Sequence, residues 1–167
     1  PGGCVKDRAA YNMINSALER GVIIAGDRLV DATSGNTGIA LAMIAKVLGV
    51  EMTLVMPDNS TKERVLSMEA YGATVILTPA AKTIEYSREL AEEMAKKEDY
   101  FILNQFGNPD NYKAHYHTTG PEIFRDTAGK VTHFVSAMGT TGTIMGVSRY
   151  LKEQHPKIQI VGTQPTD

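Results

Sequence analysis

Two short stretches of this sequence combine glycine with hydrogen-bonding side chains. The first, Thr33-Ser-Gly-Asn-Thr-Gly38, lies between a predicted strand and a predicted helix. The start of a helix leaves backbone N–H groups unpaired and carries partial positive charge, so it favours an anion. The hydroxyls and the amide of this turn could close around a small carboxylate or phosphate. The alternative is that Ser34 or Asn36 only caps the helix, as such residues commonly do.

The second stretch, Ser136-Ala-Met-Gly-Thr-Thr-Gly-Thr143, repeats this arrangement of strand, turn and helix. Its glycines allow tight folding with the N–H groups facing inward, and its threonines add hydroxyl donors. The loop could therefore hold a phosphate without a cation. No lysine follows the second glycine, as it would in a Walker A loop, and the spacing differs from the dinucleotide-binding pattern. A purely structural turn is the alternative.

Lys6 is the third candidate for chemistry, since it lies at the start of a helix expected over residues 7–20. A lysine in such a place is usually a solvated surface residue. An amine that is partly desolvated at the positive end of a helix gives up its proton more readily, and the neutral amine can attack an aldehyde. Lys6 is therefore a candidate for Schiff-base chemistry.

The elements that must position these residues alternate between strand and helix. The hydrophobic pattern predicts helices over 7–20, 38–48, 60–71, 82–97, 112–125 and 143–154, and strands over 28–33, 52–56, 74–78, 101–103, 132–137 and 159–162. Ser60 and Glu63 form a capping-box pattern at one helix start. This alternation predicts an α/β protein with parallel sheets, whose ligands gather at the carboxyl ends of the strands.

The composition excludes several classes of partner. The 167 residues carry a net charge of −2, without a basic cluster interleaved with aromatic residues, so we expect no nucleic-acid partner. No apolar run is long enough to cross a bilayer, and we expect no membrane partner. The single cysteine, Cys4, cannot form an internal disulfide, which is typical of the cytoplasm. The histidines lack a metal-ligand spacing, so we expect no metal site and interpret His115, His117 and His133 as packing or supporting residues.

Together, the motifs Pro1-Gly-Gly-Cys-Val-Lys-Asp-Arg8, Thr33–Gly38 and Gly139-Thr-Thr-Gly-Thr143 resemble those of the cysteine synthases. These are pyridoxal-phosphate enzymes of the β-replacement group, and the resemblance covers essentially the whole chain. The stretch Met138–Arg149 is most similar to the B-type enzyme, O-acetylserine sulfhydrylase B. Cys4 stands where the family commonly has serine, and we interpret it as a packing residue.

The resemblance implies a two-lobed fold with parallel sheets in three layers, the αβα arrangement of fold type II, which is tryptophan-synthase-β-like. Residues 11–109 would form the smaller, mobile substrate lobe. Residues 1–10 and 110–167 would belong to the larger cofactor-binding lobe. Family members are longer, so this chain would be a fragment that holds an incomplete version of the fold, and the family is usually homodimeric.

The resemblance also implies roles for individual residues. Lys6 would carry pyridoxal 5'-phosphate and act as the acid and base at the substrate α-carbon. The other cofactor-binding residues would be Asn36 at the ring oxygen and, at the phosphate, Gly139, Thr140, Thr141, Gly142 and Thr143. The substrate α-carboxylate would be bound by Thr33, Ser34, Asn36, Thr37 and Gln105.

The implied reaction is β-replacement in cysteine biosynthesis. O-acetylserine would lose acetate to leave α-aminoacrylate, and sulfide or thiosulfate would then add to give cysteine or S-sulfocysteine. A serine or threonine dehydratase, or a cystathionine β-synthase, would use the same lysine and is an alternative. A second alternative is a non-catalytic binding remnant that retains the motifs as architecture.

Overall fold

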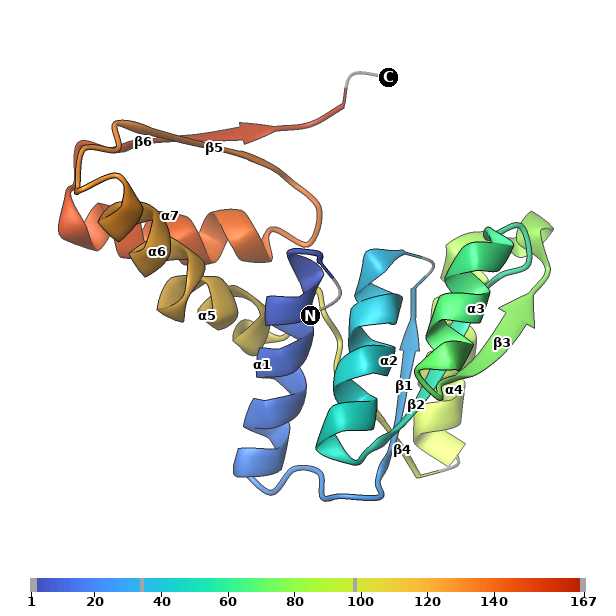
Figure 1. Cartoon of the computed structure of the whole chain (residues 1–167). Helices are drawn as coiled ribbons and strands as arrows, with labels where there is room; N and C mark the ends of the chain where they lie inside the picture. The colour runs from blue at the N-terminus through green and yellow to red at the C-terminus, as the bar shows by residue number, and fades with distance from the viewer. Residues whose placement is uncertain (1–2, 34, 98, 166–167) are drawn as a thin grey trace. The chain divides into compact units, whose positions relative to one another are not determined.

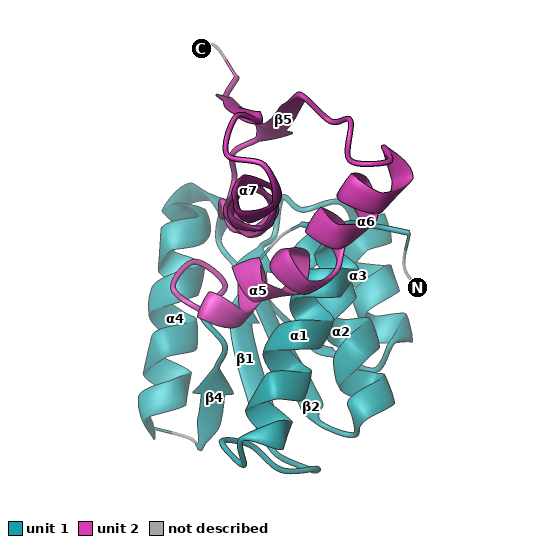
Figure 2. Cartoon of the chain, turned by 90° about the vertical axis from the view of Figure 1, so that its left-hand side faces the viewer, with its two compact units in different colours: residues 1–104 teal, residues 105–167 magenta. Residues whose placement is uncertain are grey.

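The computed structural model describes residues 3–33, 35–97 and 99–165 (Figure 1). The chain divides into two compact units, residues 1–104 (unit 1) and residues 105–167 (unit 2) (Figure 2). Strands and helices alternate in both, and every strand pairing is parallel. This confirms the predicted α/β class. In the described part of the chain, no helix has the length and apolar character needed to cross a bilayer.

Unit 1 contains a four-stranded parallel sheet in the order β3-β2-β1-β4. Its strands are β1 (Arg28–Ala32), β2 (Glu51–Pro57), β3 (Thr74–Thr78) and β4 (Tyr100–Ile102). Every residue of β2 after Glu51 is buried. A parallel strand that is covered on both faces needs such a continuous apolar run, which the sequence shows at residues 52–56.

Helices cover both faces of this sheet. They are α1 (Lys6–Glu19), α2 (Asn36–Leu48), α3 (Lys62–Ala70) and α4 (Thr83–Lys97), with a short 3₁₀ turn, η1 (Ala80–Lys82), before α4. On one face, Met13 of α1 and Leu41 of α2 are buried with Leu54 of β2. On the other face, Val30 of β1 is buried with Ala91 of α4. Unit 1 therefore has the three-layer arrangement that the sequence predicts.

The start of α3 differs from the prediction. Thr61, rather than Ser60, is the residue before the helix, and it makes no side-chain capping bond. The backbone N–H of Ser60 donates instead to the carbonyl of Pro57, 3.1 Å away, within a turn. The predicted capping box between Ser60 and Glu63 is therefore wrong, because the turn that follows β2 uses Ser60 before the helix begins.

Unit 2 contains a two-stranded parallel sheet and three helices. They are α5 (Pro109–His117), α6 (Thr119–Asp126), β5 (His133–Ala137), α7 (Gly142–Gln154) and β6 (Gln159–Thr163). Val147 and Leu151 of α7 form the core with Ile158, and Phe134 of β5 packs against them. The helix α7 is thus the crossover that joins two parallel strands and covers one face of them.

The sequence predicts one helix over 112–125 with an irregular interior at residues 118–121, and a single helix is wrong, because two helices occupy this region. The side chain of Asn108 accepts a hydrogen bond of 2.9 Å from the N–H of Asp110, so α5 begins earlier, with Pro109 at its first position. Thr118 has φ −124° and ψ −70°, outside the helical region, and separates α5 from α6. Its hydroxyl donates to the carbonyl of Ala114 at 2.6 Å, a bond that competes with helix continuation.

The boundary between the units lies after residue 104, and unit 1 includes residues 1–10. Within α1, Ala10 is buried in the same cluster as Met13 and Ile14, so the first helix packs as one piece. The functional division at residues 11 and 109, in which residues 1–10 join the larger lobe and the smaller lobe moves, stays a prediction.

One carboxylate lies inside unit 1. Asp31 on β1 is 7% exposed, and its Oδ2 has no hydrogen-bond partner among the described residues. Burial raises the pKa of Asp31 to about 6, although the backbone N–H of Ala32 and the charge of Arg88 both favour the ionised form. An ionised Asp31 therefore weakens the fold at neutral pH.

We expect Asp31→Asn to stabilise the full-length protein at neutral pH. The folded carboxyl keeps its proton more tightly than the unfolded one, so the contribution of Asp31 to stability is largest below the unfolded value of 3.8 and is lost as pH rises through the pKa of about 6. The neutral amide avoids this loss, which corresponds to about 3 kcal/mol at pH 7. Thermal unfolding of both proteins between pH 4 and 8 measures the difference. A variant that is less stable than the wild type at pH 8 would contradict it.

Candidate active site

The first Gly/Thr turn joins β1 to α2 in unit 1. The N–H of Thr33 donates to the carbonyl of Val55 at 3.2 Å, which extends the sheet, and its Oγ1 accepts from the N–H of Gly35 at 3.4 Å. Gly35 precedes α2 and Asn36 is the first helical residue. Neither therefore supplies a side-chain cap at this end, where backbone N–H groups lack intrahelical partners.

The predicted carboxylate-binding residues of unit 1 lie together in this turn. Thr33 and Thr37 are buried and Asn36 is exposed. Ser34, predicted for the same role, lies outside the described residues. A Cβ atom on Gly38 would lie 2.7 Å from Cε of Met68 and 3.0 Å from Cγ2 of Thr33. A side chain at position 38 would therefore require the end of the Met68 side chain to move.

Lys6 is the first residue of α1 and is half-buried. The chain that enters this helix is fixed locally, since Asp7 Oδ2 accepts from the N–H of Cys4 at 3.3 Å, and the N–H of Asp7 donates to the carbonyl of Cys4 at 3.1 Å. Figure 1 shows the starts of α1 and α2 at the same edge of unit 1, at the carboxyl end of β1. This edge is where a parallel sheet binds its ligands.

The second Gly/Thr loop joins β5 to α7 in unit 2. Thr141 precedes α7 with φ 63° and ψ 0°, a left-handed conformation that a β-branched residue rarely adopts. Its hydroxyl donates to Sδ of Met145 at 3.3 Å, and its carbonyl accepts from the N–H of Met145 at 2.9 Å. Strained backbone of this kind is concentrated at functional sites.

Two side chains of α5 contact this loop. Asn111 Nδ2 donates to the carbonyl of Gln105 at 2.7 Å and to Oγ1 of Thr140 at 3.1 Å. His115 lies 3.3 Å from Oγ1 of Thr143 through Nε2 and 2.9 Å from Oγ1 of Thr119 through Nδ1. Both side chains are buried. Thr140 and Thr143 are therefore each hydrogen-bonded to a side chain on one face of α5.

Two glycines of α7 permit this contact. A Cβ on Gly142 would lie 2.1 Å from Oδ1 of Asn111, and a Cβ on Gly146 would lie 2.1 Å from the carbonyl oxygen of Tyr112. Any side chain at these positions would overlap α5. The two glycines are about one helical turn apart, so they lie on the same face of α7. The absence of a side chain at these two positions allows α5 to pack closely against α7.

A cavity of about 160 Å³ opens above these contacts, within unit 2. Among the residues around it are Gln105, Asn111, Tyr112, Thr140, Thr141 and Gly142. None of its lining residues carries a carboxylate, whereas hydroxyl and amide groups and the start of α7 reach it. This donor set fits a phosphate group.

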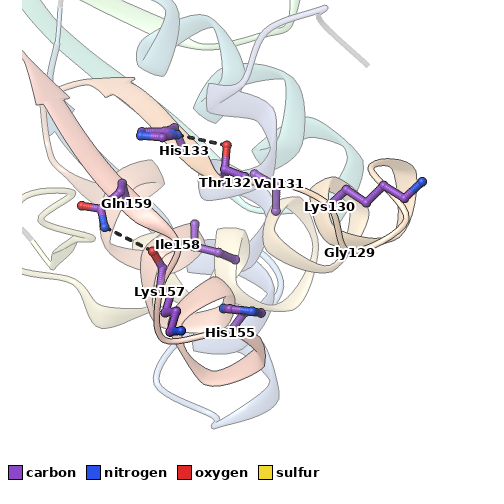
Figure 3. A pocket seen from close by; sticks show the side chains of 9 residues that line it. All are labelled: Gly129, Lys130, Val131, Thr132, His133, His155, Lys157, Ile158 and Gln159. Atoms are coloured by element: carbon purple, nitrogen blue, oxygen red, sulfur yellow. Dashed lines mark hydrogen bonds between the residues drawn. The ribbon is translucent and has the colours of Figure 1, made fainter.

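A second cavity of about 450 Å³ in unit 2 lies at the opposite ends of the strands (Figure 3). His133 and Gln159, the first residues of β5 and β6, line it with His155 and Lys157. His133 hydrogen-bonds to Oγ1 of Thr132 at 3.0 Å. Because ligands of parallel sheets bind at the carboxyl ends of the strands, the smaller cavity is the candidate site.

The predicted site residues thus fall into two groups. Within unit 1, Thr33, Asn36 and Thr37 share one turn; within unit 2, Gln105 lines the same cavity as Thr140, Thr141 and Gly142. Gly139 is exposed and Thr143 lies in the first turn of α7. That Lys6 reaches the cofactor held by this loop stays a prediction.

Sequence reasoning missed Asn111, and it gave His115 a supporting role without identifying its partner. A signal for both was present: Asn111 and His115 are four residues apart, as are Gly142 and Gly146. Two such pairs, one on α5 and one on α7, are compatible with a close contact between these helices. In the described residues, no cluster of three or more histidine, cysteine, aspartate or glutamate side chains could hold a metal.

An α/β fold with two Gly/Thr anion-binding turns and a lysine at a helix start is typical of pyridoxal-phosphate enzymes of fold type II. Residues 1–167 match the family described as pyridoxal-phosphate dependent enzyme, and the chain belongs to this family. The predicted family and cofactor class are therefore confirmed.

Individual relatives have more specific names. The chain is 58% identical to cysteine synthase B of Pseudomonas aeruginosa, over all of this chain and 56% of that protein. Its structure is similar to O-ureido-L-serine synthase (TM-score 0.95, 40% identity, 99% of this chain and 53% of that one). It is also similar to cysteine synthase from Entamoeba histolytica (TM-score 0.93, 42% identity, 96% and 48%). The chain spans about half the length of these relatives.

We expect Gly146→Ala to destabilise the full-length protein by about 2 kcal/mol or more, because the new methyl group meets backbone atoms of α5 that cannot rotate away. Gly139→Ala is the matched control. A Cβ at Gly139 has no atom of the described chain within 4 Å, so its effect on stability is expected to be small. Chemical denaturation of the three proteins measures both values. Equal stability of Gly146→Ala and the wild type would contradict the close contact.

Proposed function

We propose that the full-length protein is a pyridoxal-phosphate-dependent cysteine synthase of the B type. It replaces the acetoxy group on the β-carbon of O-acetylserine with sulfur from sulfide or thiosulfate, and the acetoxy group leaves as acetate. The observation that carries this proposal is the cavity of unit 2, where Gln105 and the Gly/Thr loop meet. The 58% identity to a cysteine synthase B over the whole chain supports it.

The Gly/Thr loop would hold the phosphate of the cofactor. The proposed donors are the hydroxyls of Thr140, Thr141 and Thr143, together with N–H groups around Gly139 and Gly142. The Thr141 hydroxyl donates to Sδ of Met145, so it would exchange this partner for the phosphate. The positive end of α7 adds to the attraction for a dianion. When bound, pyridoxal phosphate supplies an electron sink for the negative charge that develops at the substrate α-carbon.

Lys6 would hold the cofactor and move the proton at the substrate α-carbon. Lys6 is half-buried and is the first residue of α1, a helix that starts at the edge of unit 1 where the carboxyl end of β1 lies. Asn36, exposed at the start of α2, would donate its side-chain amide to the ring oxygen of the cofactor. A single base at the α-carbon is sufficient for this reaction, because the proton that is removed is later returned to the same atom.

The Thr33–Thr37 turn would bind the substrate α-carboxylate. Hydroxyls of Thr33, Ser34 and Thr37 and the amides of Asn36 and Gln105 provide neutral donors, which orient a carboxylate without adding a competing charge. We propose that the lobe of residues 11–109 closes once this carboxylate binds, which excludes water from the reacting atoms. We further propose a cytoplasmic homodimer, supported by the single cysteine and by the similarity to cysteine synthases.

The test uses purified full-length protein with O-acetylserine and either sulfide or thiosulfate. Formation of cysteine or S-sulfocysteine with equimolar acetate supports the proposal, and the ratio of the two rates identifies the preferred sulfur donor. Pyruvate without cysteine would favour a dehydratase. Cystathionine from serine and homocysteine would favour a cystathionine β-synthase. A protein that neither binds pyridoxal phosphate nor turns over any of these substrates would be a binding remnant.

We expect Lys6→Ala to lower the rate of cysteine formation by about 10³-fold or more, because it removes both the attachment point of the cofactor and the base at the α-carbon. The visible absorbance of the bound cofactor should be lost with it. Lys96→Ala, at an exposed position of α4, is the matched control and should leave both signals unchanged. An undiminished absorbance band in Lys6→Ala would overturn the role of Lys6.

A further inference from the structure

The side chain of Asn111 bonds both to the segment of Gln105 and to the Gly/Thr loop. It is 5% exposed, and its two bonding partners are separated from it by 6 and 29 residues. Asn111 and the two residues to which it bonds line the same cavity. Its bonds therefore concern the geometry of the cavity.

The orientation of the Asn111 amide is fixed by its partners. The carbonyl oxygen of Gln105 can only accept, so the atom of Asn111 that lies 2.7 Å from it must be the nitrogen. The second hydrogen of Nδ2 is then available for Oγ1 of Thr140 at 3.1 Å. The opposite orientation would bring two carbonyl oxygens into contact, which is repulsive.

This orientation decides what the Thr140 hydroxyl can do. Its oxygen accepts from Nδ2 of Asn111 and, at 3.5 Å, from the N–H of Gly142. A hydroxyl oxygen has two lone pairs, so both acceptor positions are used and the hydroxyl hydrogen remains for a third partner. Thr140 lines the cavity. Its hydroxyl is therefore set in advance as a donor toward a bound anion.

The other bond of Asn111 fixes the segment that carries Gln105. Holding the Gln105 carbonyl determines where the backbone of this residue lies relative to Thr140, and the side chains of both residues reach one cavity. Under the proposed function, Gln105 binds the substrate carboxylate and Thr140 binds the cofactor phosphate. A single amide then sets the spacing between the two binding groups.

We propose that Asn111 is a positioning residue that keeps the Thr140 hydroxyl a donor and holds Gln105 at a fixed spacing from it. This proposal rests on the proposed function for the identity of the two ligands. Removing the amide should weaken both binding events. Each effect corresponds to about one hydrogen bond, or about tenfold in the dissociation constant.

The test is a double-mutant cycle in the full-length protein with Asn111→Ala, Thr140→Val and the combined variant. The first readout is the dissociation constant of pyridoxal phosphate, from the visible absorbance when apoprotein is titrated. The second is the dissociation constant of L-alanine, a substrate analogue without a leaving group. We expect Asn111→Ala to raise both about tenfold, and to raise the first less than about threefold when Thr140 is already valine.

Lys113→Ala, exposed on the same helix, is the control and should leave both constants unchanged. If Asn111→Ala does not fold, Asn111→Ser replaces it in the same measurements. A purely structural role predicts a lowered unfolding temperature with unchanged constants, or the same effect of Asn111→Ala in both Thr140 backgrounds. Either result would overturn the proposal, as would a change in only one constant. These binding readouts do not depend on sulfur transfer, so a wild type that binds both ligands but makes no cysteine refutes the proposed function alone.

Discussion

The close approach of α5 to α7 is the contact on which the candidate site of unit 2 depends. Gly142 and Gly146 place no side chain at the two points of α7 where Asn111 and the backbone of Tyr112 come closest. Asn111 and His115 can then reach the hydroxyls of the loop directly, without intervening water. The result is a set of donors whose directions are fixed before any ligand arrives, and preorganised donors of this kind bind an anion without a cost of rearrangement.

Unit 1 is built on a different constraint, the parallel register of its sheet. Strand β1 lies between β2 and β4, and its carboxyl end leads directly into the turn that contains Thr33 and Thr37. The same strand carries Asp31, whose burial costs stability at neutral pH. This loss of stability occurs next to a candidate binding turn. Functional regions of proteins are commonly less stable than the core.

The hydrophobic periodicity and the turn residues of the sequence predicted much of the fold. The continuous apolar run of β2 and the left-handed Gly49 after α2 are local signals, so they could be found in the sequence. The irregular residues 118–121 were also a local signal, but the complete break at Thr118 was not predicted, because it depends on a side-chain bond to Ala114 that competes with the helix. The bonds of Asn111 were also missed, since their partners become neighbours only when α5 packs on α7. The roles of Lys6 and of the threonines rest on resemblance and stay predictions.

The bond between Asn111 and Thr140 joins residues that are 29 positions apart. Contacts with such long separation require loop closure, so they form late, when the helices of unit 2 have already met. A peptide that contains only the loop and α7 would therefore lack the ordered hydroxyls, however well its helix formed. Binding of an anion through these hydroxyls would thus report completed tertiary assembly and would distinguish the native state from compact states that retain only secondary structure.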